Sequence, residues 1–202
     1  FRISAVGDRG AYLSTFGPGI LTTGMARVVS GSYAIPAISL RVRGAFTNTV
    51  PVDAFRGSGS VDPATMLERV VDVAAAQTGR DPMELRRLNL LPQRAMPYTT
   101  PVGMVYDSGD YGAVYDAALD KADWSGFAPR RAASEASGRK RGIGISLYVH
   151  GTGGIADEQA IVEVHPDGFV SALAGGQTGG QGHETIFAQL VAAEFDLPYA
   201  ET

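Results

Sequence analysis

The sequence contains no cysteine among its 202 residues. This absence excludes disulfide bonds, thiolate metal ligands, protein-held iron–sulfur clusters and a cysteine nucleophile within the chain. Long hydrophobic runs are also missing, since no apolar stretch approaches the roughly 20 residues that span a bilayer. The three histidines, at positions 150, 165 and 183, do not have the spacing of a metal site. We therefore predict no membrane span and no metal bound directly by the chain.

Positive charge is in short supply as well. The 17 lysines and arginines face 21 aspartates and glutamates, which gives a formal net charge of −4. This balance argues against a nucleic acid or an anionic membrane as a partner held by bulk charge. Hydrophobic residues make up 45% of the chain, which is typical of a globular protein that buries a core. The chain begins with Phe1 and shows no signal peptide, so we expect a piece of a longer protein.

The first 60 residues are rich in glycine and β-branched residues. Their pattern predicts strands at residues 3–6, 37–42 and 45–50, and a short helix at 20–29. A clear helix follows, with Asp62 as its N-cap, a first-turn proline and Gly79 at its end. Helical spacing assigns one face of it to the core and the other to solvent. The predicted core residues are Leu67, Val70, Val71, Ala74 and Ala75, and the predicted solvent residues are Glu68, Arg69 and Asp72.

Capping signals and prolines organise the rest of the chain. Asp81 and Glu84 have capping-box spacing, which predicts a helix to about Asn89. Residues 92–101 should be extended or turning, residues 107–111 should cap a helix that runs to Lys121, and residues 129–141 should form a basic surface segment. The remaining pattern predicts strands at 143–149, 159–164 and 169–174, a hairpin turn at 166–168, and a helix at 186–195.

These elements predict an α+β fold, or mixed α/β. Residues 1–135 should form a first lobe, with helices after a loop that contains Arg56. Residues 140–202 should begin a second lobe, made of β-hairpins, a glycine-rich loop and a helix.

The glycine-rich loop covers residues 175–185 and precedes a predicted helix. Glycines let backbone N–H groups approach a ligand, and a helix start adds partial positive charge. A P-loop would need a lysine here, and the dinucleotide fingerprint would need glycine where Thr185 stands. The amides of Gln177 and Gln181 both donate and accept hydrogen bonds. A ligand with mixed donor and acceptor edges and a plain turn without a ligand both fit this loop.

A second short loop, residues 54–59, places Arg56 among small residues just before a helix. Such an arginine can bind a carboxylate, phosphate or oxo group, or can form a structural ion pair. Both readings remain open for this loop.

Several segments match a known protein family in their order along the chain. They stand at residues 8–12, 33–36, 54–57, 68–72, 79–89, 97–100, 106–111 and 179–185. Together they resemble the molybdenum-cofactor-binding large subunit of the molybdenum hydroxylases, such as xanthine dehydrogenase, aldehyde oxidase and carbon monoxide dehydrogenase. The pieces at Tyr98 and Tyr106 are most similar to the carbon monoxide dehydrogenase-like branch.

The resemblance implies an oxidoreductase subunit that binds a molybdenum–molybdopterin cofactor, in the cytosine dinucleotide form. It implies hydroxylation of an aldehyde or N-heterocycle carbon with oxygen derived from water. Electrons would pass to a 2Fe-2S small subunit and an FAD-binding medium subunit, in a cytoplasmic dimer of heterotrimers. The alternative is a non-catalytic module for assembly or for binding a nucleotide-like ligand.

The resemblance also implies roles for individual residues. Arg56 would lie near molybdenum, and the cofactor-binding set would be Ala54, Arg56, Gly180, Gln181 and Gly182. Phe55 and Ser58 would contact the substrate. No residue of this chain would be the catalytic base, because the family's glutamate belongs to a later motif, outside these residues.

Three positions depart from the family's better known branches. Gly57 stands where the carbon monoxide enzymes have a copper-binding cysteine, which argues against the copper–molybdenum route. Ser58 replaces a substrate-stacking phenylalanine of the purine hydroxylases, and Gly24 aligns with their second substrate-binding arginine. These departures favour an aldehyde or another heterocycle over a purine.

Overall fold

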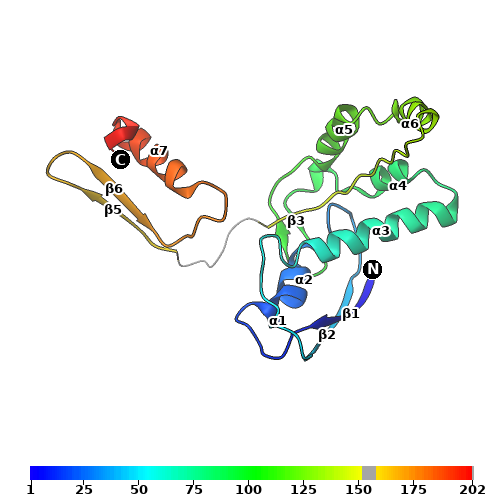
Figure 1. The fold of residues 1–202 in the computed structure, drawn as a ribbon, viewed down its shortest axis with the longest axis horizontal. Coiled ribbons are helices and arrows are strands. Elements are labelled where there is room, and N and C mark those ends of the chain that lie inside the picture. Colours follow the sequence, from blue (N-terminus) through cyan, green and yellow to red (C-terminus); the bar gives the residue numbers. More distant parts are fainter. Residues whose placement is uncertain (152–157, 202) are drawn as a thin grey trace. The chain divides into compact units, whose positions relative to one another are not determined.

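The computed structural model describes residues 1–151 and 158–201. The chain divides into two compact units, residues 1–151 and residues 152–202 (Figure 1). Within these described residues, helices occur together with one parallel and two antiparallel strand pairs. This mixture confirms the predicted α+β class.

In the first unit, a parallel pair of strands forms the base of the N-terminal region. Strand β1 (Arg2–Asp8) pairs with β2 (Ser39–Ala45) along its whole length. A parallel pair requires a crossover connection, and here it contains the helical turns α1 (Gly17–Gly19), η1 (Ile20–Gly24) and α2 (Met25–Val28). The predicted helix at 20–29 is thus confirmed, although it begins three residues earlier. Ile3, Met25 and Val29 form the buried core between crossover and sheet.

The predicted strand at 45–50 is wrong, because the regular ladder ends at Ala45. Gly10 adopts a left-handed conformation, with φ of 66°, just after β1. Beyond that turn, Thr47 N donates to the Gly10 carbonyl and its hydroxyl donates to the Asp8 carboxylate at 2.6 Å. Residues 46–50 therefore form a loop held by side-chain and irregular backbone hydrogen bonds.

Two helices follow the Arg56 loop, α3 (Val61–Thr78) and α4 (Pro82–Asn89). Gly79 ends α3 at φ of 66°, and the Asp81 carboxylate accepts from the backbone N–H groups of Met83 and Glu84. Both signals confirm the prediction. The predicted N-cap of α3 is wrong, however. Ser60 holds that position without a side-chain capping hydrogen bond, and Asp62 lies within the first turn.

The predicted faces of α3 are also wrong at two positions, since Glu68 is buried and Val70 is half exposed. Glu68 is buried because it pairs with Arg86 on α4. The Arg86 Nε donates to Glu68 Oε2 at 2.9 Å, and only 1% of the Arg86 side chain is accessible. The Tyr33 hydroxyl donates to Glu68 Oε1 at 2.5 Å, and Arg86 also contacts Asp72 at 2.8 Å. Burial and the hydrogen bond to Glu68 raise the pKa of Tyr33. This cluster joins the crossover to both helices.

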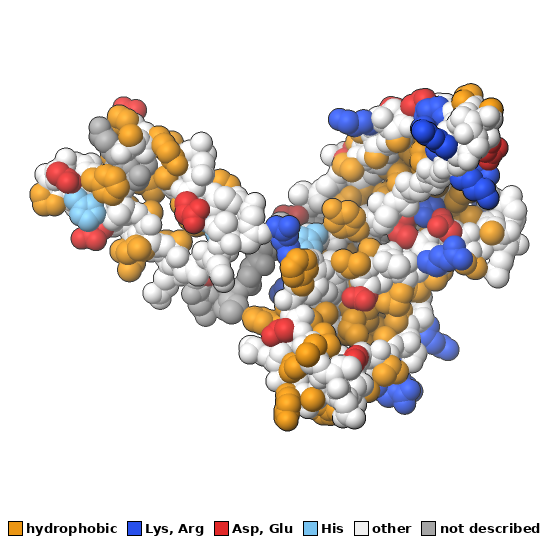
Figure 2. Space-filling view, viewed as in Figure 1, with side chains coloured by type: hydrophobic (Ala, Val, Ile, Leu, Met, Phe, Trp, Pro, Cys, Tyr) orange, Lys and Arg blue, Asp and Glu red, His pale blue; other side chains and the backbone are white. Residues whose placement is uncertain are grey.

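The first unit is completed by short elements that largely follow the predictions. After η2 (Gln93–Ala95), strands β3 (Tyr98–Thr99) and β4 (Val105–Tyr106) form a small hairpin. Asp110 caps α5 (Tyr111–Lys121), as predicted. Helix α6 (Phe127–Ala136) was not predicted as a helix. It overlaps the predicted basic segment at residues 129–136, and Figure 2 shows Lys and Arg side chains gathered in that region.

The predicted strand at 143–149 is wrong within the described residues. These residues alternate between half-buried and exposed, as an extended chain does, but pair with no strand that the structure describes. An extended conformation requires only local backbone preferences, whereas a strand requires a neighbour at the right distance.

The second unit combines a hairpin and a helix. Strands β5 (Ala160–Val164) and β6 (Val170–Ala174) are antiparallel around the predicted turn at 166–168. Helix α7 (His183–Phe195) begins three residues before the predicted start, and η3 (Tyr199–Glu201) follows it. All five residues of β5 are exposed. In the described parts of both units, no helix is both long and apolar enough to cross a membrane.

The buried ion pair between Glu68 and Arg86 leads to a first prediction. Glu68→Ala should lower the free energy of unfolding of the intact subunit by about 3 kcal/mol, because it leaves the Arg86 charge buried without its main partner. Urea unfolding provides the measurement. The matched control is Glu135→Ala, which removes an exposed pair with Arg131 and should cost less than about 0.5 kcal/mol. Equal losses in the two variants would contradict this account.

The hydroxyls of two buried tyrosines lead to a second prediction, on the stability of the first unit. Tyr33→Phe should cost about 1.5–3 kcal/mol, since it removes a hydrogen bond to a carboxylate. Tyr106→Phe should be neutral or slightly stabilising, because the buried Tyr106 hydroxyl has no hydrogen-bond partner among the described residues. Thermal unfolding of the two variants in parallel tests this order, and the reverse order would refute it.

Candidate functional site

The Arg56 loop is a tight turn that presents its side chains outward. Ser58 N donates to the Phe55 carbonyl at 2.7 Å, and Ser60 N donates to the Gly57 carbonyl at 3.1 Å. Ala54, Phe55, Arg56 and Ser58 are exposed, with Phe55 at 83%. The loop thus displays the predicted binding residues on one short segment.

Close backbone packing fixes the end of this loop. A Cβ atom on Gly59 would lie 2.8 Å from both the Ile20 oxygen and the Gly24 carbonyl carbon. Only glycine allows the loop to approach the crossover helix so closely. Gly24 is therefore part of the backbone contact that holds the end of the loop.

Two hollows adjoin the loop, and Arg56, Gly57 and Val61 border both. The first has a volume of about 450 Å³ and is bordered by the end of β1, the crossover and the loop, including Phe55 and Ser58. The second has a volume of about 440 Å³. Its other lining residues are Ser60, Ala64, Thr65, Ser146, Tyr148 and His150.

Two charged residues border the first hollow at the end of β1. The Asp8 carboxylate accepts hydrogen bonds from the Thr47 hydroxyl and the Gly10 backbone, which lower its pKa. Arg9 is buried and donates to the Gly17 carbonyl. Asp8 and Arg9 therefore hold the surrounding loops in place.

The glycine-rich loop of the second unit is closed by its own hydrogen bonds. Gln181 Oε1 accepts from Gly179 N at 2.7 Å, and His183 N donates to the Thr178 hydroxyl at 3.2 Å. Gly182 is the N-cap of α7 at φ of 71° and supplies no side chain. The Thr178 hydroxyl thus accepts from the first N–H group of α7, and the N-cap residue itself contributes no capping side chain. The partial positive charge of the helix start favours anionic or acceptor groups nearby.

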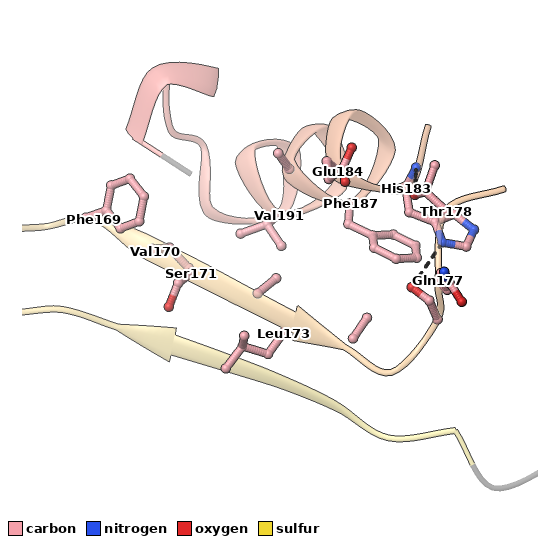
Figure 3. A pocket seen from close by; sticks show the side chains of 14 residues that line it. Phe169, Val170, Ser171, Leu173, Gln177, Thr178, His183, Glu184, Phe187 and Val191 are labelled. Carbon is pink, nitrogen blue, oxygen red and sulfur yellow. Dashed lines mark hydrogen bonds between the residues drawn. The ribbon is translucent and has the colours of Figure 1, made fainter. Parts of the chain in front are cut away.

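A groove of about 570 Å³ lies between β6 and α7 (Figure 3). Its floor and wall are apolar and include Val170, Leu173, Phe187 and Val191, while Gln177, Thr178, His183 and Glu184 line its loop end. The His183 ring stacks on Phe187 with centroids 4.9 Å apart. His183 thus packs within its own unit and covers one end of the groove.

The predicted site residues fall into two sets. Ala54, Phe55, Arg56 and Ser58 share the loop of the first unit, and Gly180, Gln181 and Gly182 share the loop of the second. Sequence reasoning missed Ser60, Tyr148 and His150, which line the second hollow beside Arg56. The alternation in residues 143–149 was the available signal for Tyr148. Among residues 1–151 and 158–201, no three His, Asp or Glu side chains gather as a metal site.

Comparison with known protein families shows which family the chain belongs to. Residues 1–90 match one family model described as a molybdopterin cofactor-binding domain, and residues 117–201 match a second model of the same description. The chain belongs to the molybdenum hydroxylase large-subunit family. The resemblance found in the sequence is therefore confirmed. Arg56 lies in the first matched region and Gln181 in the second.

Individual relatives agree with this assignment. The chain is 35% identical to the carbon monoxide dehydrogenase large chain of Hydrogenophaga pseudoflava, over 98% of this chain and 26% of that protein. It is 34% identical to the 6-hydroxypseudooxynicotine dehydrogenase complex subunit gamma of Paenarthrobacter nicotinovorans, over 94% of this chain and 24% of that one. Quinoline 2-oxidoreductase of Pseudomonas putida 86 superposes with a TM-score of 0.86 at 28% identity, over 99% of this chain and 27% of that chain. The chain spans about a quarter of the length of these relatives.

The glycine-rich loop of this molybdopterin-binding chain makes a third prediction. Gly180→Ala should destabilise the loop by about 1–3 kcal/mol, because Gly180 has a φ of 112°. Hydrogen exchange across residues 176–186 of the intact subunit measures this loss. Gly179→Ala is the matched control, since the nearest atom to a Cβ there is Gln181 Oε1 at 3.5 Å and its φ is not positive. Faster exchange in Gly179→Ala than in Gly180→Ala would contradict the prediction.

Proposed function

We propose that this chain supplies two loops of the molybdenum-cofactor site in a molybdenum hydroxylase, an oxidoreductase. The observation that carries the proposal is the pair of cofactor-binding matches, at residues 1–90 and 117–201. Each matched region contains a glycine-containing loop that leads directly into a helix, α3 in one unit and α7 in the other.

The residues present fit such a cofactor by their chemistry. A pyranopterin with a dinucleotide tail offers mixed donor and acceptor edges and anionic phosphates. The loop at Gly180–Gly182 offers an amide side chain and leads into the positive end of α7, whose N-cap residue has no side chain. Arg56, exposed between two hollows, offers five N–H donors in a planar fork. These residues would hold the cofactor by hydrogen bonds and charge, without a covalent bond from the chain to the metal.

Each predicted residue then has a stated role. Arg56 would lie near the metal, and Ala54, Gly180, Gln181 and Gly182 would complete the cofactor-binding set. Phe55 and Ser58 would contact the substrate. When bound, the cofactor supplies the redox centre at which a substrate carbon is hydroxylated with oxygen derived from water. The proton acceptor would be a glutamate from a later part of the subunit.

The substrate we propose is an aldehyde or an N-heterocycle. Gly57 leaves no thiolate for copper beside Arg56, so the copper–molybdenum chemistry of the carbon monoxide enzymes is not supported here. Ser58 offers no aromatic ring for stacking on a purine. The relatives named for a nicotine derivative and for quinoline support a heterocyclic substrate.

Partners follow from the same proposal. We infer that the intact protein passes electrons to a 2Fe-2S small subunit and an FAD-binding medium subunit, as a dimer of heterotrimers in the cytoplasm. The cofactor would be the cytosine dinucleotide form. Support comes from relatives named as a large chain or as a subunit of a dehydrogenase complex.

The fourth prediction tests the site in the intact complex. Arg56→Ala and Gln181→Ala should each lower molybdenum and pterin content or kcat at least tenfold, since each removes charge or hydrogen bonds from the cofactor site. Metal analysis and turnover of an aldehyde are the measurements. Matched controls are Arg69→Ala and Gln77→Ala, which change exposed residues of α3. Unchanged content and activity in both loop variants would refute the site assignment, and a wild-type complex without molybdenum would refute the function.

A further inference from the structure

A hydrogen bond between residues 90 positions apart shapes the second hollow beside Arg56. The Ser60 hydroxyl lies 3.1 Å from His150 Nδ1. Serine at a helix N-cap ordinarily bonds a backbone N–H of the first turn, which stabilises a helix by about 1 kcal/mol. Ser60 makes no such bond in α3. Its hydroxyl instead holds the imidazole of His150 at the border of the hollow.

The lining of this hollow favours a ligand that accepts hydrogen bonds. Six lining side chains carry a donor, namely Arg56, Ser60, Thr65, Ser146, Tyr148 and His150. Among the described residues, no carboxylate lines it. The first hollow differs, because three carboxylates, Asp8, Asp53 and Asp62, line it together with Arg9 and Arg56. The second hollow, with Arg56 and no carboxylate among the described residues, is therefore the more favourable of the two for an anionic group.

Geometry also allows Arg56 and His150 to act on one group. Both side chains are exposed and line the same hollow of about 440 Å³. The guanidinium has five donors, so it can bind one more acceptor besides any partner it already has. With Nδ1 directed at Ser60, the imidazole Nε2 remains as the second ring nitrogen able to donate to a ligand.

We propose that this hollow binds a carboxylate on the substrate, and that His150, positioned by Ser60, is a specificity-determining residue. This inference rests on the proposed function, since it names the substrate class of the same Arg56 loop. The substrate would be a carboxylated aldehyde or heterocycle. A cofactor phosphate shares the acceptor chemistry, so the experiment separates the two sources.

The first measurement needs no turnover. Calorimetric titration of the intact complex with benzoate and with benzamide compares a carboxylate with a neutral group of similar size. The wild type should bind benzoate more tightly. His150→Leu should weaken benzoate binding about three- to tenfold more than benzamide binding, and Ser60→Ala should do so to a smaller extent.

The matched control uses a second His–Ser pair. His165 Nε2 lies 2.9 Å from the Ser171 hydroxyl in the β5–β6 hairpin. His165→Leu therefore makes the same change and breaks the same kind of contact without altering the hollow. It should keep the wild-type preference for benzoate.

Turnover supplies a second measurement. The ratio of kcat/KM for 4-carboxybenzaldehyde over benzaldehyde should fall about three- to tenfold in His150→Leu, mainly through KM. His150→Gln should retain part of the ratio, because its amide can still donate a hydrogen bond.

The outcomes separate a site for a substrate carboxylate from a site for a cofactor phosphate, and this proposal from the proposed function. Equal benzoate and benzamide affinities in the wild type would overturn the proposal. So would a loss of pterin or nucleotide from His150→Leu, which would assign the hollow to a cofactor phosphate. Absence of molybdenum from the wild type would refute the proposed function alone, since the titration of benzoate requires no metal.

Discussion

The buried ion pair between Arg86 and Glu68 is the constraint on which the first unit depends. Removing two charges from water is costly, and the cost is offset only by good geometry and further hydrogen bonds. Tyr33 and Asp72 provide those bonds. Because the four residues come from the crossover, α3 and α4, satisfying the charges fixes these segments together. The start of α3, and with it the Arg56 loop, is positioned as a consequence.

Both candidate loops use glycine in a similar way to bring backbone near a helix start. Gly59 permits contact with the crossover, and Gly182 begins α7 in a left-handed conformation. A loop anchored in this way presents side chains without needing a core of its own. In the first unit those side chains point outward, whereas Gln181 in the second bonds within its loop. The side chains of the Arg56 loop are therefore exposed to a ligand, whereas the Gln181 amide oxygen already accepts a hydrogen bond from its own loop.

The contact at Gly24 and the segment that carries His150 both shape the surroundings of the Arg56 loop. A Cβ atom on Gly24 would lie 3.2 Å from the Gly19 carbonyl oxygen, a tight contact, and 3.5 Å from Gly59 Cα, an ordinary one. Tyr148 and His150, on an extended segment, line the second hollow beside Arg56. Family membership identifies the type of cofactor, and the tertiary structure decides which side chains surround the Arg56 loop.

The sequence by itself determined the features that depend on near neighbours in the chain. Asp81 and Asp110 cap helices, Gly79 ends one, and residues 166–168 turn a hairpin, because each signal acts over a few residues. The order of short motifs likewise identified the family. Only the tertiary structure decided that Glu68 is buried, that residues 143–149 lack a paired strand among the described residues, and that Ser60 meets His150. These features depend on partners 18 to 90 positions away, which no local pattern specifies.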